Sequence, residues 1–327
     1  MKNFEYARAK TVKQAVTLCA EMETKPIAGG TNLIDLMKLQ VETPSRLIDL
    51  NSLDDRGIEE LGEGLRIGAL ASNTAVAVDQ RVRADYPVLA KAILAGATQQ
   101  LRNRASVGGN LGQRTRCFYF TNIDQPCNKR EPGSGCGALK GVARIHAILG
   151  ASRHCIATYP GDMAVAMAAL DAQVEIFGPT SKSRMVALRD FHRCPGDRPE
   201  LDNILGPGEL VVAVHLPAPV GGTQLYRKVR ERSSYAFALC SVAAIVDVTR
   251  GKIARADLAF GSIAPKPWVD ERLSQLLVGD KPSIALFEKA ADVLVDDARG
   301  VGDNDYKIPL MRRTLIATLC ETTEISA

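Results

Sequence analysis

The chain has 327 residues, of which 46% are hydrophobic and 24% are charged. This length exceeds one ordinary hydrophobic core, so we expect two or three packed units in a globular protein. A formal net charge of +4 at pH 7 and an aromatic content of 5% argue against a nucleic-acid-binding surface, and no apolar run reaches the ~20 residues of a membrane span.

The first part of the chain predicts two α/β units. In residues 3–51, FEYARA, KPIA and RLIDL have the pattern of strands, and VKQAVTLCAEM that of a helix with Thr11 as its N-cap. A second unit begins at LRIGAL and continues with helical spacing in TAVAVDQRVRADYPVLAKAILAGAT. DMAVAMAALDAQVEIFG then predicts a helix and a strand, and ELVVAVHLP a further strand. Residues 1–16 lack the apolar run and cleavage site of a secretory signal, so we expect no export signal on this chain itself.

The last third follows a linker, PAPVGG at 217–222. YRKVRERSSYAFALCSVAAIVDV and GKIARADLAFGSIA predict antiparallel strands joined by a turn at 249–251. ERLSQLL, ALFEKAADVLVDDA and PLMRRTLIATLC have helical spacing.

Two glycine pairs stand at predicted strand-to-helix or loop-to-helix junctions. Gly29 and Gly30 precede Thr31 and Asn32 in PIAGGTNLIDLMK, and the second pair lies in RASVGGNLG. Backbone N–H groups at such junctions bind anions such as a diphosphate, although either pair alone also fits an ordinary tight turn. No Rossmann or Walker fingerprint is present, so a dinucleotide would bind in another fold.

Four cysteines lie in the segment between the second glycine loop and Asp162, namely Cys117, Cys127, Cys136 and Cys155. Four thiolates suit a [4Fe–4S] cluster or a structural zinc, and the absence of paired C-x2-4-C spacing favours iron–sulfur. A surface loop with incidental thiols is the remaining alternative. His146 and His154 are alternative ligands by proximity. No Ser/His/Asp set, paired carboxylates or H-E-x-x-H motif occurs, so we predict no catalytic residue on this chain.

A resemblance adds to this interpretation. In order along the chain, AGGTNLIDLMK, LRIGAL, QLRNRASVGGNL, ATYPGDMAVAMAALDA and YRKVRERSSYAFA resemble the FAD-binding medium subunit of the xanthine oxidase family of molybdenum hydroxylases. RTRCFYF, QPCNKREPGSGC and RIHAILGASRHCIATYPGDMA are similar to the periplasmic aldehyde oxidoreductase branch, whose medium subunit holds FAD and a [4Fe–4S] cluster. Most family members lack this cysteine-bearing insertion.

The resemblance implies an α+β fold of the FAD-binding vanillyl-alcohol-oxidase (PCMH) type. Residues 1–57 would form an N-terminal α/β FAD-binding subdomain, and 58–220 a central α/β subdomain with the [4Fe–4S] insertion at about 111–156. Residues 221–327 would form a C-terminal domain with a three-stranded antiparallel sheet and a helical bundle.

Site residues are implied position by position. The cluster would be bound by Cys117, Cys127, Cys136 and Cys155. Lys228 would lie near the flavin ring, where positive charge stabilises the reduced anionic flavin. The other FAD contacts would be Pro26, Ile27, Ala28, Gly29, Gly30, Thr31, Asn32, Leu33, Ser106, Val107, Gly108, Gly109, Asn110, Asp162 and Val211.

The implied function is that of an electron-transfer subunit in a heterotrimeric molybdenum-dependent aldehyde oxidoreductase. A large partner would carry the molybdenum cofactor and a small partner [2Fe–2S] clusters, and FAD would pass electrons to an external acceptor. An alternative is the β subunit of a complex like 4-hydroxybenzoyl-CoA reductase, in which electrons run toward molybdenum. Co-export with a twin-arginine-bearing partner would place the complex in the periplasm, and otherwise it stays in the cytoplasm. A stand-alone flavoprotein oxidase or a zinc-stabilised binding module is a more distant alternative.

Overall fold

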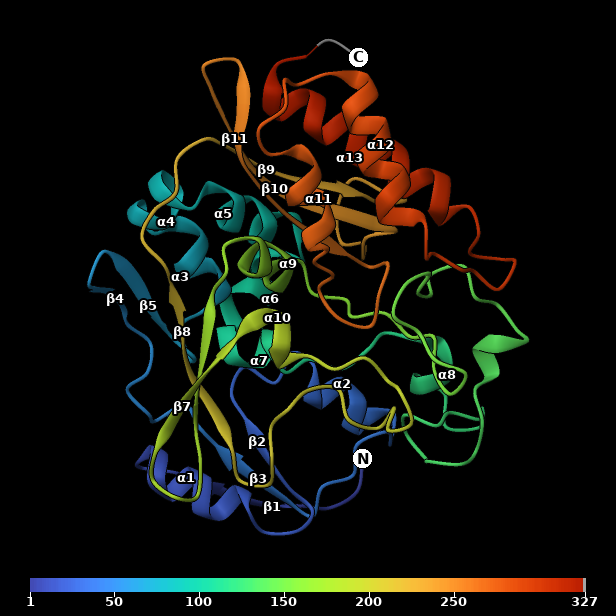
Figure 1. The fold of residues 1–327 in the computed structure, drawn as a ribbon. Coiled ribbons are helices and arrows are strands. Elements are labelled where there is room, and N and C mark those ends of the chain that lie inside the picture. Colours follow the sequence, from blue (N-terminus) through green and yellow to red (C-terminus); the bar gives the residue numbers. More distant parts are fainter. Residues whose placement is uncertain (326–327) are drawn as a thin grey trace.

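The computed structural model describes residues 1–325 and contains three sheets, each covered by helices (Figure 1). The N-terminal unit alternates strands and helices, and its three strands are parallel in the order β1-β3-β2. Thr11 caps its first helix by accepting a hydrogen bond from the Gln14 N–H, as predicted. The elements are β1 (Glu5–Arg8), α1 (Val12–Cys19), β2 (Thr24–Ile27), α2 (Leu33–Lys38) and β3 (Arg46–Asp49).

The central unit is built on an antiparallel five-stranded sheet with the order β4-β5-β8-β6-β7. Its helices pack on one another and on the C-terminal sheet, and α9 is buried along its whole length. The strands are β4 (Ile58–Leu61), β5 (Gly64–Gly68), β6 (Gln173–Phe177), β7 (Ser183–Ala187) and β8 (Leu210–Leu216). The helices are α3 (Asn73–Val78), α4 (Gln80–Asp85), α5 (Pro87–Ala95), α6 (Gln99–Arg104), α7 (Val107–Leu111), α9 (Asp162–Ala169) and α10 (Leu188–Phe191).

The C-terminal unit packs three helices against an antiparallel sheet with the order β11-β10-β9. Arg250 and Gly251 have positive φ angles of 53° and 73°, as a two-residue hairpin turn requires, and they join β10 to β11 at the predicted turn. The elements are β9 (Thr223–Val229), β10 (Cys240–Thr249), β11 (Lys252–Gly261), α11 (Glu271–Leu277), α12 (Ile284–Val295) and α13 (Lys307–Thr323). One expectation was wrong: residues 230–239 form a loop between β9 and β10 rather than part of a strand.

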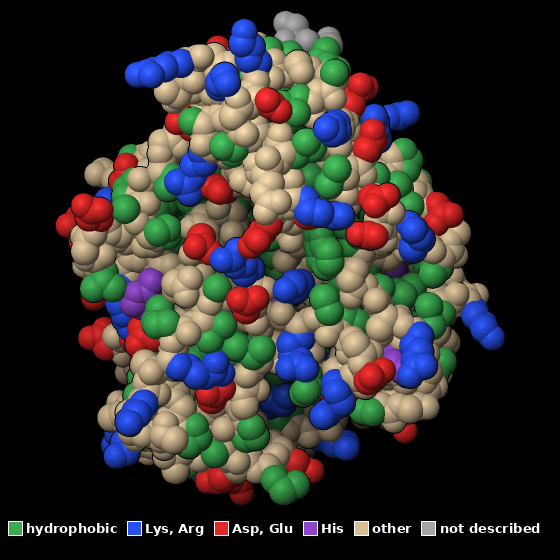
Figure 2. Space-filling model, in the orientation of Figure 1, with side chains coloured by type: hydrophobic (Ala, Val, Ile, Leu, Met, Phe, Trp, Pro, Cys, Tyr) green, Lys and Arg blue, Asp and Glu red, His purple; other side chains and the backbone are tan. Residues whose placement is uncertain are grey.

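The cysteine-bearing segment lies at the side of the molecule, between the C-terminal unit and the N-terminal unit (Figure 1). It holds one short helix, α8 (Phe118–Thr121), and one 3-10 turn at Gly137–Leu139, and is otherwise irregular. Its inner side chains pack on α2 through Leu36. Within residues 1–325 no helix is long and apolar enough to cross a membrane. Acidic and basic side chains are interspersed on the face shown in Figure 2.

Candidate functional site

The first glycine loop, between β2 and α2, lies directly against the end of α6. A Cβ atom on Gly29 would be 1.9 Å from the Arg104 carbonyl oxygen, so only glycine permits this approach. Gly30 has a φ of 75°, which glycine adopts without strain. The loop therefore owes its position to two residues that lack a side chain.

The second glycine loop forms α7 and is held at both ends. Ser106 Oγ accepts a hydrogen bond from the Gly109 N–H at 3.2 Å. At the other end, Tyr159 donates its hydroxyl proton to the Asn110 carbonyl at 3.0 Å, and His192 Nε2 donates to the Leu111 carbonyl at 2.9 Å. Burial lowers the pKa of His192 to about 4, so this imidazole stays neutral at pH 7.

A cavity of about 380 Å³ lies beside these loops. Four of the predicted cofactor-binding residues line it: Thr31, Asn110, Asp162 and Lys228. The other predicted loop residues are not part of its lining: Pro26, Ile27, Ala28, Gly29, Gly30, Asn32, Leu33, Ser106, Val107, Gly108 and Gly109. Val211 lies in β8, paired with Ile176, and is also outside the lining.

The base of this cavity holds a buried ion pair. Lys228 Nζ lies 2.8 Å from Asp162 Oδ2 and also donates to the Ala95 carbonyl at 3.1 Å. Tyr226 donates its hydroxyl proton to the other oxygen, Asp162 Oδ1, at 2.6 Å. Burial raises the pKa of Tyr226, so the phenol remains a donor. The Lys228 side chain is only 4% exposed, so the charge is held in one place.

Polar atoms without partners belong to Asn73 and Arg116 in the lining of this cavity, and to Asn32, which follows the lining residue Thr31. Asn32 Nδ2, Asn73 Oδ1 and Arg116 Nε are buried, and none has a hydrogen-bond partner among the described residues. Buried polar atoms in native proteins are normally paired, so these three indicate a polar ligand. Together with the loops that approach through glycine, they fit a long cofactor with a charged centre, such as FAD.

Sequence reasoning missed several lining residues. Asn73 follows β5 at the start of α3, while Gln113 and Arg116 come from the segment after α7. Tyr235 and Phe237 belong to the 230–239 loop, which the sequence pattern assigns to a strand. The available clue was the motif YRKVRERSSYAFA, which places two aromatic residues shortly after Lys228.

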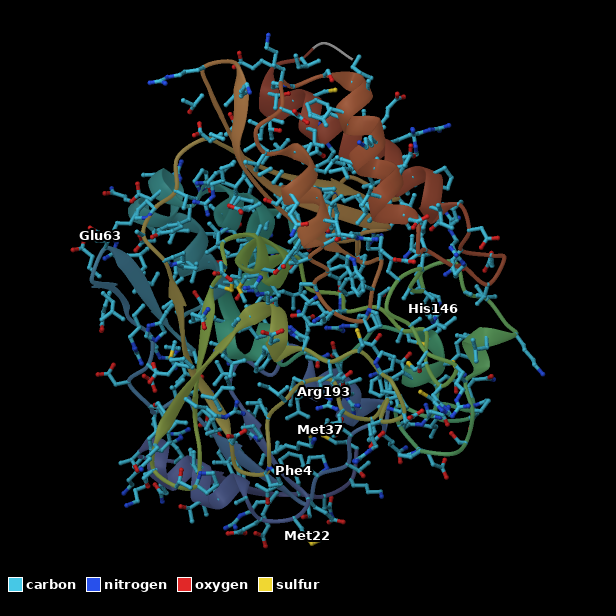
Figure 3. The ribbon with its side chains drawn as sticks, viewed as in Figure 1. Phe4, Met22, Met37, Glu63, His146 and Arg193 are labelled. Carbon is cyan, nitrogen blue, oxygen red and sulfur yellow. The ribbon has the colours of Figure 1, made fainter. Side chains whose placement is uncertain are left out.

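The structure brings the four predicted cysteines around one small second cavity, which His146 and His154 also line. Cys127 and Cys136 face each other across an isolated antiparallel bridge. His146 Nε2 lies 3.1 Å from Cys117 Sγ, and Figure 3 shows this histidine among the loops beside α8. His146 Nδ1 is buried and has no partner among the described residues.

The chemistry of these thiols suits a metal centre. All eight cysteines of the chain are free, with no disulfide among them. Burial raises the pKa of Cys117 to about 12 and that of Cys155 to about 11, so bound cations are needed to hold them as thiolates at neutral pH. No group of three or more His, Cys, Asp or Glu side chains within residues 1–325 is arranged around a single metal ion.

Comparison with known proteins identifies similar chains. The family model described as the FAD binding domain in molybdopterin dehydrogenase matches residues 2–219, and that of the CO dehydrogenase flavoprotein C-terminal domain matches 224–322. The chain is 50% identical over 326 residues to the aldehyde oxidoreductase FAD-binding subunit PaoB of Escherichia coli K12, covering 98% of both chains. It is 26% identical over 313 residues to the carbon monoxide dehydrogenase medium chain of Afipia carboxidovorans, covering 93% of this chain and 91% of that one.

Among solved structures, a chain of the reconstituted CO dehydrogenase from Oligotropha carboxidovorans has the same fold. The TM-score is 0.78 at 24% identity, and the match covers 99% of both chains. The expected α+β fold with a C-terminal three-stranded antiparallel sheet is thereby confirmed.

Proposed function

Because the chain belongs to the molybdenum hydroxylase family as an FAD-binding medium subunit, we propose that it is the electron-transfer subunit of a molybdenum-dependent aldehyde oxidoreductase. It would receive electrons from the molybdenum and [2Fe–2S] centres of two partner subunits and deliver them through FAD to an external acceptor. When bound, FAD supplies the conversion between one-electron and two-electron transfer. The observation that carries the proposal is a cavity for FAD beside a cavity lined by four cysteines.

The residues of this chain bind and orient the cofactor. The two glycine loops would approach its diphosphate through backbone N–H groups. Lys228, held by Asp162 and the Ala95 carbonyl, would present a fixed positive charge to the flavin ring. That charge favours electron density on the ring, which is the direction of electron flow proposed here.

For the second cavity we propose a [4Fe–4S] cluster bound by Cys117, Cys127, Cys136 and Cys155. The four thiols line one buried site, and a cluster suits them because each thiolate binds a different iron and the four need not converge on one ion. A structural zinc requires such convergence, with sulfur about 2.3 Å from the metal. Electron paramagnetic resonance of the chemically reduced complex should show a cluster signal that Cys127→Ser abolishes. Identical spectra for the wild-type complex and for Cys127→Ser would contradict the assignment of a cluster to these four cysteines.

The direction of electron flow is tested on the purified complex without oxygen. Addition of an aldehyde should bleach the flavin absorption, and addition of an external acceptor should restore it. If a reduced donor instead drives reduction of an aromatic CoA thioester while aldehydes leave the flavin oxidised, the complex is a reductase of the 4-hydroxybenzoyl-CoA type.

The cellular location that we propose rests on a signal sequence of a partner subunit rather than on this chain. A twin-arginine signal on the small subunit would export the folded complex to the periplasm with its cofactors in place. Fractionation of cells that express the whole complex tests this. Activity that stays in the cytoplasm when that signal is intact would contradict it.

A further inference from the structure

One short segment separates the two cavities. Gln113 and Arg116 line the FAD cavity, whereas Thr115 and Cys117 line the cysteine cavity. A single peptide bond therefore joins a residue of one site to a ligand candidate of the other. Thr115 holds the backbone in place at the cysteine cavity. Its hydroxyl donates to the Thr158 carbonyl at 2.9 Å and accepts from the Cys117 N–H at 3.3 Å.

Arg114 anchors this segment to the first glycine loop. Its backbone N–H donates to Asn32 Oδ1 at 3.0 Å. Its guanidinium forms ion pairs with Glu42 at 2.6 Å and Asp202 at 2.7 Å, and Asp202 also pairs with Lys129 at 2.6 Å. Glu42 also pairs with Lys25 at 3.4 Å, so the group contains three cations and two anions, and both anions pair directly with Arg114. The guanidinium charge of Arg114 is therefore neutralised by carboxylates of the protein itself.

The neighbouring Arg116 has no such carboxylate partner within residues 1–325. No hydrogen bond or ion pair involves its guanidinium among the described residues, and its Nε is buried. Its guanidinium lies over the ring of Phe237, whose centre is 5.4 Å from Cζ. Asp35 lines the same cavity, but no ion pair joins it to Arg116.

The other cationic side chains of the cavity all have partners. Arg102 donates to the Gly96 carbonyl at 2.7 Å, Arg232 donates to the Tyr235 carbonyl, and Lys228 pairs with Asp162. Holding the Arg116 cation partly buried without an anionic partner costs free energy. An anion in the cavity would remove that cost.

We propose that Arg116 binds the diphosphate of FAD. The inference rests on the proposed FAD-binding function and adds a cofactor contact supplied by the cysteine-bearing segment. The diphosphate is the permanently charged part of FAD, and the planar guanidinium fork matches phosphate oxygens in a bidentate arrangement. Thr31 and Asn110, which end the two glycine loops, line the same cavity as Arg116. Disorder of the loop that begins at Cys117 would then lower the affinity for FAD.

The test uses the purified complex after removal of its flavin. FAD and riboflavin, which lacks phosphate, are titrated into wild type, Arg116→Gln and the control Arg153→Gln. Arg153 lies in the same insertion, but its side chain is 81% exposed. We expect Arg116→Gln to weaken FAD binding by about tenfold to a hundredfold, as for a lost charge-assisted hydrogen bond, and to leave riboflavin binding unchanged. The control should change neither.

Two results would overturn the inference: FAD affinity of Arg116→Gln equal to wild type, or an equal loss for FAD and riboflavin, which would mark a structural role. If Arg116→Gln does not assemble, Arg116→Lys serves as the second variant. It keeps the charge but loses the fork, so it should bind FAD more weakly than wild type and riboflavin equally well. A wild-type complex that binds no FAD would instead refute the proposed function itself.

Discussion

The buried pair of Asp162 and Lys228 yields a prediction that can be worked through from the structure. Asp162→Asn keeps the shape of the side chain but removes its charge. Lys228, with a side chain 4% exposed, would then be a buried cation whose remaining partner is the Ala95 carbonyl. Tyr226 would still donate its hydroxyl proton to the side-chain amide oxygen of the variant. The perturbation is therefore confined to the ion pair.

Breaking a buried ion pair by removing one partner costs about 3 kcal/mol or more. For a chain of 327 residues the unfolding entropy is on the order of 0.7 kcal/mol/K, so this loss lowers the unfolding temperature by about 4 °C. Asp162→Asn/Lys228→Met removes both charges and leaves no unpaired ion. We expect the double variant to recover at least half of the loss.

The assay is differential scanning calorimetry of the deflavinated complex, because bound FAD would itself stabilise the folded state. Asp197→Asn is the matched control, since this carboxylate is 84% exposed and pairs only at the surface. Its unfolding temperature should change by less than about 1 °C. The reasoning is refuted if Asp162→Asn melts at the same temperature as the wild type. It is also refuted if the loss in the double variant equals the sum of the losses in Asp162→Asn and in Lys228→Met, each measured alone.

Three further predictions follow from other sites. Gly29→Ala should abolish FAD retention because the new Cβ would lie 1.9 Å from the Arg104 carbonyl oxygen. The control Gly221→Ala should retain FAD, since a Cβ at that position has no atom within 4 Å. Equal flavin content in the two purified variants would contradict this prediction. His146→Ala removes the imidazole whose Nε2 lies 3.1 Å from Cys117 Sγ. If Nε2 donates a hydrogen bond to this sulfur, the variant should lower the midpoint potential of the proposed cluster by on the order of 40 mV in a redox titration. An unchanged potential would exclude the hydrogen bond. Burial lowers the pKa of Lys307 from 10.5 to about 7, so the unfolded state binds more protons between these values and stability should rise by about 1.4 kcal/mol per pH unit above pH 7. Lys307→Met should lack that rise in unfolding experiments from pH 7 to 9, and parallel curves for the two proteins would contradict the assignment.

Much of the fold was accessible from local patterns. Thr11 precedes an amphipathic run, and the β10–β11 turn falls at a predicted break, so propensity and capping were enough there. The 230–239 loop was missed because its apolar residues continue the pattern of β10. Tyr235 and Phe237 remain more than half exposed at the FAD cavity instead of entering a core.

The candidate site, like the fold, was predictable from the sequence only in part. Motifs placed the glycine loops and the four cysteines, which are close in sequence. The partners of these residues depend on distant segments: Asp202 meets Arg114 and Lys129 across more than 70 residues, and His192 reaches Leu111 across 81. Arg116 had no sequence signal beyond its position before Cys117. Its unpaired state is visible only once every neighbouring charge has been placed.

The central claim is that one chain holds FAD and a four-iron cluster side by side, and metal analysis tests it most directly. Iron, zinc, acid-labile sulfide and FAD are measured in the purified complex and in a variant with Cys127 and Cys136 both replaced by serine. The account predicts four fewer irons per FAD in the variant, with matching loss of sulfide and no zinc in either protein. Equal iron in both proteins, or one zinc per chain in the wild type, would contradict it.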